Sequence, residues 1–222
     1  MLNQQNPTIA IIDSGIGGIS ILRQLIKRYK AGNYLYYADN LFMPYGNKTK
    51  IWLSKRIDFI IKELQNKYRV DYIIIACNTA SASIDVSKYK NLYTMSFNKK
   101  YTYLATRLTK QNMSELDVIA DNNLAKQIDK HIRNTSNIKN IIKHHIKKYN
   151  LNKIKNLVLG CTHYELVEDL FKKYCPNTNI IKNSSFMIKN LKFDIKSDEI
   201  NIKILLSKKD ENYEVKIRNL LN

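Results

Sequence analysis

Two hydrophobic patterns alternate along this chain. Short apolar runs, such as residues 8–12 and 73–76, are bounded by turn residues, which is typical of buried strands. Longer segments repeat apolar residues every three or four positions, which is typical of amphipathic helices. The pattern predicts strands at residues 8–12, 34–38, 73–76, 92–95, 116–120, 157–159, 179–181 and 200–206, the last at a sheet edge. It predicts helices at residues 19–29, 52–64, 101–108, 124–132, 138–149 and 164–174.

The order of these elements predicts the fold class. Strand and helix alternate three times in the first part of the chain, which favours an α/β fold with mainly parallel sheets flanked by helices. One plan occurs twice: an apolar strand ends at a cysteine, Cys77 or Cys161, and hydrogen-bonding side chains follow it directly. We infer a two-domain layout from this doubling. Because parallel strands present functional groups at their carboxyl ends, we expect the site at that edge of each sheet.

The composition narrows the class of protein and its partners. Of the 222 residues, 44% are hydrophobic and 25% are charged, as in a globular protein. The net charge of +18 would suit a polyanion, but the lysines are spread along the whole chain, so nucleic acid is the less favoured partner. The densest lysine stretch, residues 139–155, has the helical spacing of a solvated helix face. The start of the chain lacks the features of a secretory signal and no apolar run approaches the roughly 18 residues of a membrane helix, so we expect a cytoplasmic protein without membrane contact.

The three cysteines are expected to be free thiols. Cys77, Cys161 and Cys175 are an odd and sparse set, which argues against a disulfide framework. None of them forms a pair with a short metal-ligand spacing, so we expect no metal. A lone cysteine after an apolar run is usually a small core residue, and only the second copy of the plan makes Cys77 a candidate for chemistry.

A glycine turn follows the first strand. Asp13-Ser14-Gly15-Ile16-Gly17-Gly18 joins the strand at residues 8–12 to a helix, and such a turn directs backbone N–H groups at one spot. A carboxylate ligand fits it as well as a phosphate, while close packing of helix on strand is an equal alternative. The spacing is not that of the dinucleotide-binding fingerprint.

Two thiols at strand ends could perform a specific reaction. Inversion of an α-amino acid requires one group to remove the α-proton and another to return a proton on the opposite face. A thiol, with a usual pKa of about 8.5, can serve as base or acid. A pair formed by Cys77 and Cys161 would therefore work in both directions without a cofactor.

Four motifs taken together resemble the glutamate racemase family. They are Asp13-Ser14-Gly15-Ile16-Gly17-Gly18, Pro44-Tyr45-Gly46, Ala76-Cys77-Asn78-Thr79-Ala80-Ser81 and Gly160-Cys161-Thr162-His163, in the order of the family. The resemblance implies two pseudo-symmetric α/β domains with the substrate in the cleft between them: residues 1–90 plus 183–222, and a second, shortened domain at residues 91–182. It implies cofactor-independent interconversion of L- and D-glutamate, with D-glutamate supplied for peptidoglycan, and it is compatible with a homodimer.

The resemblance also implies roles for individual residues. Cys77 and Cys161 would be the acid/base pair, with Asp13 assisting Cys77 and His163 assisting Cys161. The residues expected to bind substrate are Asp13, Ser14, Tyr45, Gly46, Asn78, Thr79, Thr162 and His163.

The chain departs from the family in its middle and near its end. It is shorter between residues 83 and 116, where Thr94 or Thr109 would stand in for a threonine-rich substrate loop. Asp121 is the candidate for the acidic residue near the second cysteine, and Asn183-Ser184 replaces an acidic-small pair. Two alternatives follow: a racemase of aspartate or another amino acid, and a non-catalytic basic binding protein.

Overall fold

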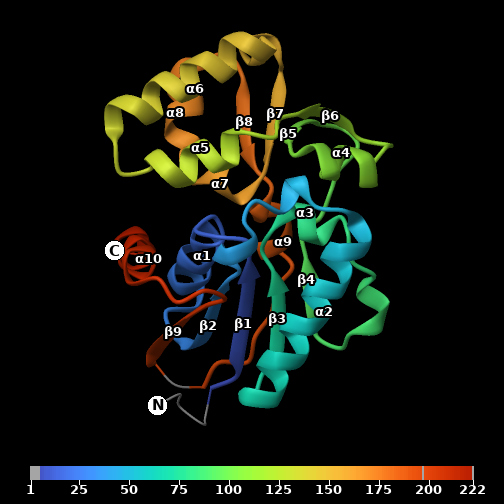
Figure 1. Ribbon diagram of the computed structural model, residues 1–222, viewed down its shortest axis with the longest axis vertical. Helices are drawn as coiled ribbons and strands as arrows, with labels where there is room; N and C mark the ends of the chain where they lie inside the picture. The colour runs from blue at the N-terminus through green and yellow to red at the C-terminus, as the bar shows by residue number, and fades with distance from the viewer. Residues whose placement is uncertain (1–5, 197, 222) are drawn as a thin grey trace.

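The protein consists of two parallel β-sheets with helices packed against both of them (Figure 1). The structure is a computed structural model, and it describes residues 6–196 and 198–221. The first sheet has the order β4-β3-β1-β2-β9 and the second has the order β6-β5-β7-β8. This arrangement confirms the α/β class.

The first sheet is built around β1, whose six residues are all buried. Its strands are β1 (Thr8–Asp13), β2 (Gly32–Ala38), β3 (Tyr72–Ile75), β4 (Leu92–Thr94) and β9 (Ile200–Leu206). The predicted edge strand is confirmed, since β9 pairs with β2 alone among the described strands. Helices α1 (Ile19–Tyr29) and α10 (Glu211–Leu221) contribute to the core on one face, and α2 (Lys50–Lys67) contributes to the core on the other. A strand covered on both faces must be mainly apolar, as residues 9–12 of β1 are.

The second sheet is smaller. Its strands are β5 (Thr102–Ala105), β6 (Asp117–Ala120), β7 (Asn156–Gly160) and β8 (Asn179–Lys182). Leu157 and Leu159 of β7 face the helices α5 (Leu124–His131), α6 (Thr135–Tyr149) and α8 (Glu168–Tyr174), whereas Val158 packs on the opposite face with Tyr103. The alternation follows from the two-residue period of a strand.

Two of the predicted helices are corrected by the structure. The prediction of a helix at residues 101–108 is wrong. Thr102–Ala105 forms β5, and the helix α4 (Arg107–Asn112) begins only after this strand. The short apolar run fits both states, and parallel pairing with β6 and β7 decides for the strand. The helix expected at residues 164–174 is divided into α7 (Thr162–Glu165) and α8, with Leu166 and Val167 between them.

The carboxyl ends of both sheets meet where the two halves of the chain contact each other. The short helices α3 (Asn78–Ser81), α7 and α9 (Ser184–Ile188) lie at this junction (Figure 1). The chain passes from the first sheet to the second after β4 and returns after β8, so that β9 and α10 belong to the first half. Strand β4 lies just beyond residue 90, yet it pairs with β3 in the first sheet. The remaining short helices are η1 (Asn40–Phe42), η2 (Tyr45–Asn47), η3 (Val86–Lys88) and η4 (Leu151–Lys153).

Among the described residues, no helix is both long and apolar enough to cross a membrane.

Candidate active site

The two candidate thiols occupy equivalent positions in the two halves. Cys77 follows β3 and begins α3, while Cys161 follows β7 and begins α7. Their exposed fractions are 6% and 8%, and the two side chains are close enough for the charge of one to raise the pKa of the other. Both are reduced thiols, as is Cys175, which lies in the core of the second half. The sequence-predicted pair is therefore brought together, and Cys175 is apart from it.

The surroundings of Cys77 favour the neutral thiol. Burial raises the pKa of Cys77 well above its usual value, and the neighbouring Asp13 carboxylate raises it further. Backbone N–H groups of Thr79 and Ala80 face the sulfur and lower the pKa in part. Cys77 is therefore a neutral thiol near pH 7.

The surroundings of Cys161 are different, because a histidine lies beside it. His163 is buried and hydrogen-bonds with Cys161, and its Nε2 lies 3.3 Å from Oδ2 of Asp129. Burial alone would lower the pKa of His163, but the hydrogen bonds with Asp129 and Cys161 outweigh this effect and raise the pKa to about 10. The pKa of Asp129 falls to about 2: burial would raise it, but the partners His163 and Lys216 have the larger combined effect.

Asp129 was not among the residues that sequence analysis singled out. Asp121 lies elsewhere: its carboxylate accepts hydrogen bonds from Tyr149 and the backbone of α5 and is paired with His145. A signal for Asp129 existed, since it lies on the apolar face of α5 next to Ile128, where an unpaired carboxylate would be costly.

Asp13 joins the two halves directly. Its Oδ1 accepts a hydrogen bond of 3.1 Å from Thr162 Oγ1, and its Oδ2 accepts one of 3.0 Å from the N–H of Gly15. The glycine turn packs tightly on this contact, because a Cβ on Gly17 would lie 2.3 Å from Thr162 Oγ1. Only glycine leaves room for the second half at that point. Ser14 is buried in the same turn.

Three threonine hydroxyls form a buried cluster between the halves. Thr79 Oγ1 lies 2.9 Å from Thr106 Oγ1, which lies 3.0 Å from Thr109 Oγ1. The turn at Gly46 lies against this cluster, since a Cβ there would be 2.8 Å from Thr106 Cβ. Thr109, considered from sequence for a missing substrate loop, is thus placed beside Thr79. Thr94 ends β4 instead, and Thr106 was missed.

An amide pair next to Cys77 has unused hydrogen-bonding groups. Asn183 Nδ2 donates to Asn78 Oδ1, which joins α3 to the segment that follows β8. Asn78 Nδ2 and Asn183 Oδ1 are buried without a hydrogen-bond partner among the described residues. A buried donor and acceptor without partners are costly, and a ligand with both carboxylate and ammonium groups would satisfy them.

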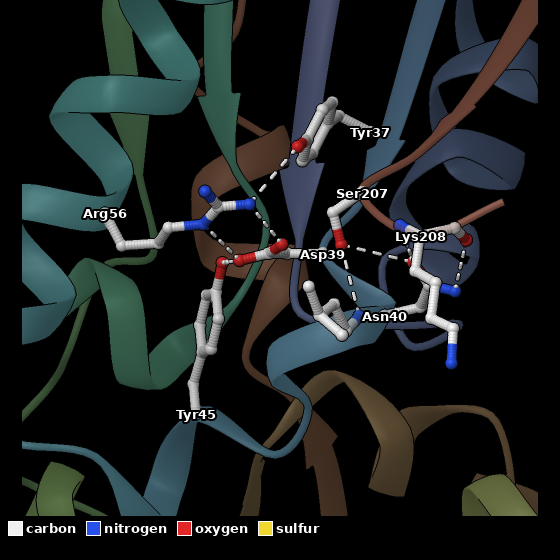
Figure 2. Close-up of polar contacts among 8 residues, drawn as sticks. Tyr37, Asp39, Asn40, Tyr45, Arg56, Ser207 and Lys208 are labelled. Carbon is white, nitrogen blue, oxygen red and sulfur yellow. Dashed lines mark hydrogen bonds and ion pairs between the residues drawn. The ribbon is translucent and has the colours of Figure 1, made fainter.

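The hydroxyl group of Tyr45 is already hydrogen-bonded to a residue of the first half. Its hydroxyl donates to Asp39 Oδ2 at 2.6 Å, and Arg56 forms two further hydrogen bonds with the same carboxylate (Figure 2). Asp39 is fully buried at the end of β2. In the same view, the neighbouring Asn40 forms hydrogen bonds with Ser207 and Lys208, which follow β9. These contacts fix the turn, so that its backbone, more than the Tyr45 hydroxyl, is available to a ligand.

Among the described residues, no three or more His, Cys, Asp or Glu side chains lie together so that they could hold a metal ion.

Comparisons with known proteins agree with this geometry. The chain is 30% identical to glutamate racemase of Buchnera aphidicola, over 95% of this chain and 93% of the relative. Among solved structures, glutamate racemase from Thermus thermophilus in complex with β-chloro-D-alanine superposes with a TM-score of 0.80 at 18% identity, covering 99% of this chain and 94% of that one. Escherichia coli glutamate racemase, in complex with L-glutamate and the activator UDP-MurNAc-ala, gives a TM-score of 0.75 at 20% identity and covers 97% and 92%. No protein-family model matches the chain.

The two-sheet fold is that of the solved structures, and the relatives that the chain matches over most of its length place it in the class of amino-acid racemases. Within that class, the chain belongs to the glutamate racemase family.

Proposed function

We propose that this protein interconverts L- and D-glutamate without a cofactor, using Cys77 and Cys161 as its two acid/base groups. The observation that carries the proposal is the meeting of two buried cysteines at the carboxyl ends of two sheets, each with its own polar neighbours. Membership of the glutamate racemase family supports it.

The unlike surroundings of the cysteines suit a two-base reaction. In one direction the Cys161 thiolate takes the α-proton and becomes a thiol, while the Cys77 thiol gives its proton to the opposite face and becomes a thiolate. The reverse direction uses the same groups with their roles exchanged. Asp13 assists Cys77 and His163 assists Cys161, because each lies beside its own thiol.

The polar groups at the junction are suited to an amino acid with two carboxylates. The unpaired Asn78 Nδ2 is a donor for a carboxylate, and the unpaired Asn183 Oδ1 is an acceptor for the ammonium group. The threonine cluster, Thr162, Ser14 and the turn at Tyr45 and Gly46 supply further donors. We assign them to the binding of glutamate, in agreement with the glutamate racemases whose structures are solved in complex with D- or L-glutamate.

We further propose that the product D-glutamate serves peptidoglycan synthesis in the cytoplasm, as the family resemblance implies. Growth of a D-glutamate auxotroph on expression of this chain tests that role. Light scattering of the purified protein tests the expected homodimer.

Chiral chromatography tests the reaction itself. Purified protein incubated with L-glutamate should yield D-glutamate and approach an equal mixture, while D-glutamate should give the same mixture. L-aspartate, tested in parallel, should react much more slowly. A folded protein that leaves both glutamate enantiomers unchanged would contradict the proposal, and faster conversion of aspartate would change the substrate.

A further inference from the structure

The last helix of the first half, α10, contacts the second half through two side chains. Helix α10 follows β9 and packs on α1 (Figure 1). Its Ile217 is fully buried in the core of the first half. Two polar side chains one turn apart on this helix, Tyr213 and Lys216, instead contact Asp129 in α5. Residues three apart on a helix share one face, so both can reach the same carboxylate.

Both oxygens of that carboxylate have partners from α10. Tyr213 Oη donates to Asp129 Oδ2 at 2.7 Å, and Lys216 Nζ donates to Asp129 Oδ1 at 2.8 Å. Lys216 Nζ also donates to the backbone carbonyl of Asp129 at 2.8 Å, near the end of α5, where carbonyl groups lack partners within the helix. The Asp129 side chain is 6% exposed and that of Lys216 is 17% exposed, so water screens the ion pair weakly.

The same carboxylate also contacts the proton-transfer groups of the second half. Its Oδ2 faces His163 Nε2, and His163 hydrogen-bonds with Cys161. A continuous series of contacts therefore runs from α10 through Asp129 and His163 to Cys161. Two further titratable groups face this series of contacts. Asp13, at the end of β1, raises the pKa of Tyr213, and Tyr36 of β2 lies near both Tyr213 and Asp129.

A shared carboxylate controls the proton affinity of its histidine. If Asp129 faced His163 alone, the whole negative charge would stabilise the imidazolium. Lys216 and Tyr213 draw part of that charge toward α10, which lowers the proton affinity of His163. A proton that His163 holds less tightly is exchanged more readily with the neighbouring groups during proton transfer.

We propose that Lys216 and Tyr213 are positioning residues for racemisation: from the first half, they hold and partly neutralise Asp129, and so link contact between the two halves to proton transfer at Cys161. This inference rests on the proposed racemase function.

Substitutions on α10 test the link with a matched control. Lys216→Met removes the charge, Lys216→Arg keeps it, and Tyr213→Phe removes a single hydroxyl. Arg218→Met is the control, because Arg218 lies on the same helix but pairs only with Glu214 among the described residues, at an exposed position. We expect Lys216→Met to lower kcat/KM by about tenfold, the equivalent of one pKa unit. Tyr213→Phe should lower kcat/KM by a smaller factor, and Lys216→Arg should keep it close to the wild-type value. Arg218→Met should be unchanged.

Isotope effects distinguish a positioning role from a structural one. Because L- and D-glutamate are equally stable, kcat/KM must fall equally in both directions. The primary isotope effect measured with α-deuterated substrate can differ between the two directions. Lys216→Met should raise this isotope effect only for the enantiomer whose α-proton Cys161 removes. In ¹⁵N NMR titrations, which need no activity, Lys216→Met should move the His163 pKa upward and Arg218→Met should not.

The outcomes separate the two proposals. An inactive, folded wild type would overturn the proposed function. An active wild type whose Lys216→Met variant keeps its kcat/KM, isotope effects and His163 pKa would overturn only the role of α10, as would a downward move of that pKa. Circular dichroism checks folding, and if Lys216→Met does not fold, Tyr213→Phe carries the same comparisons.

Discussion

Thr162 Oγ1 donates a hydrogen bond of 3.1 Å to Oδ1 of Asp13, and these residues are 149 positions apart in the chain. One follows β7 in the second sheet and the other ends β1 in the first. The contact thus joins the carboxyl ends of the two sheets beside both cysteines. It makes Asp13 a residue of the junction as well as a neighbour of Cys77.

Removal of this hydrogen bond should slow racemisation. Thr162→Val keeps the shape of the side chain but leaves Asp13 Oδ1 without its donor, and a buried hydrogen bond to a charged group contributes roughly 1.5–3 kcal/mol. We expect kcat/KM to fall by about tenfold or more, while Thr162→Ser stays near wild type. Equal rates for Thr162→Val and wild type would show that the junction does not depend on the contact.

Asp13 should control the protonation of Cys77. Its charge is the second cause, after burial, of the raised pKa of Cys77, so Asp13→Asn should lower that pKa while burial keeps it above the usual value. Thiolate absorbance measured against pH, in a background with Cys161→Ser and Cys175→Ser, reports Cys77 alone. The exposed Asp194→Asn serves as the charge-matched control and should leave the titration unchanged. An unaltered Cys77 titration in Asp13→Asn would contradict the assignment.

The pair that fixes the Tyr45 turn should matter for stability. Arg56→Met leaves the fully buried Asp39 without its cation, and loss of one partner of a buried pair costs about 3–5 kcal/mol. Urea denaturation should show this loss, and the added change Asp39→Asn should recover part of it. Lys67→Met, which breaks the exposed pair with Glu63, should change the midpoint little. A similar midpoint for Arg56→Met and Lys67→Met would refute the prediction.

Glu165 should make stability depend on pH. Burial raises its pKa from 4.5 to about 7, although hydrogen bonds from Ser184 and Ser20 partly oppose the rise. The folded protein therefore holds this proton more tightly than the unfolded chain, and the free energy of unfolding should decrease as pH rises from about 4.5 to about 7.

Glu165→Gln should flatten that part of the pH dependence. The amide oxygen can still accept from the Ser184 N–H, and the serine hydroxyls can turn to accept from the amide nitrogen. Above pH 7 the variant should be more stable than wild type by up to roughly 3 kcal/mol, the equivalent of the shift. Urea denaturation between pH 5 and pH 8 measures this, with the exposed Glu63→Gln as control. If the free energy of unfolding of Glu165→Gln still decreased with pH as in the wild type, a group other than Glu165 would cause the pH dependence.

Sequence pattern predicted the parts of the site that lie directly after strands. Asp13, Cys77 and Cys161 each follow an apolar run, and a buried parallel strand brings such residues to one edge. The pattern failed at residues 101–108, where a four-residue strand and the start of a helix share one apolar stretch. Local spacing cannot separate these states, because the sheet partners decide between them.

The contacts that sequence analysis did not predict join residues that are far apart in the chain. Asn183 reaches Asn78 only because the chain returns from the second half, and Lys216 reaches Asp129 only through the final helix. Lys216 is one of 37 lysine and arginine residues, so its presence in the sequence carries no signal. The tertiary structure supplies the burial that makes these side chains significant.

Racemisation in D₂O tests the central claim most directly. With two thiols acting on opposite faces, D-glutamate formed early from L-glutamate should carry deuterium at the α-carbon, while the recovered L-glutamate should retain its hydrogen. Cys77→Ala and Cys161→Ala should each lower the rate by on the order of 100-fold. Mass spectrometry of the separated enantiomers gives the answer. No α-deuterium in either enantiomer, or equal deuterium in both from the first turnovers, would contradict the two-cysteine account.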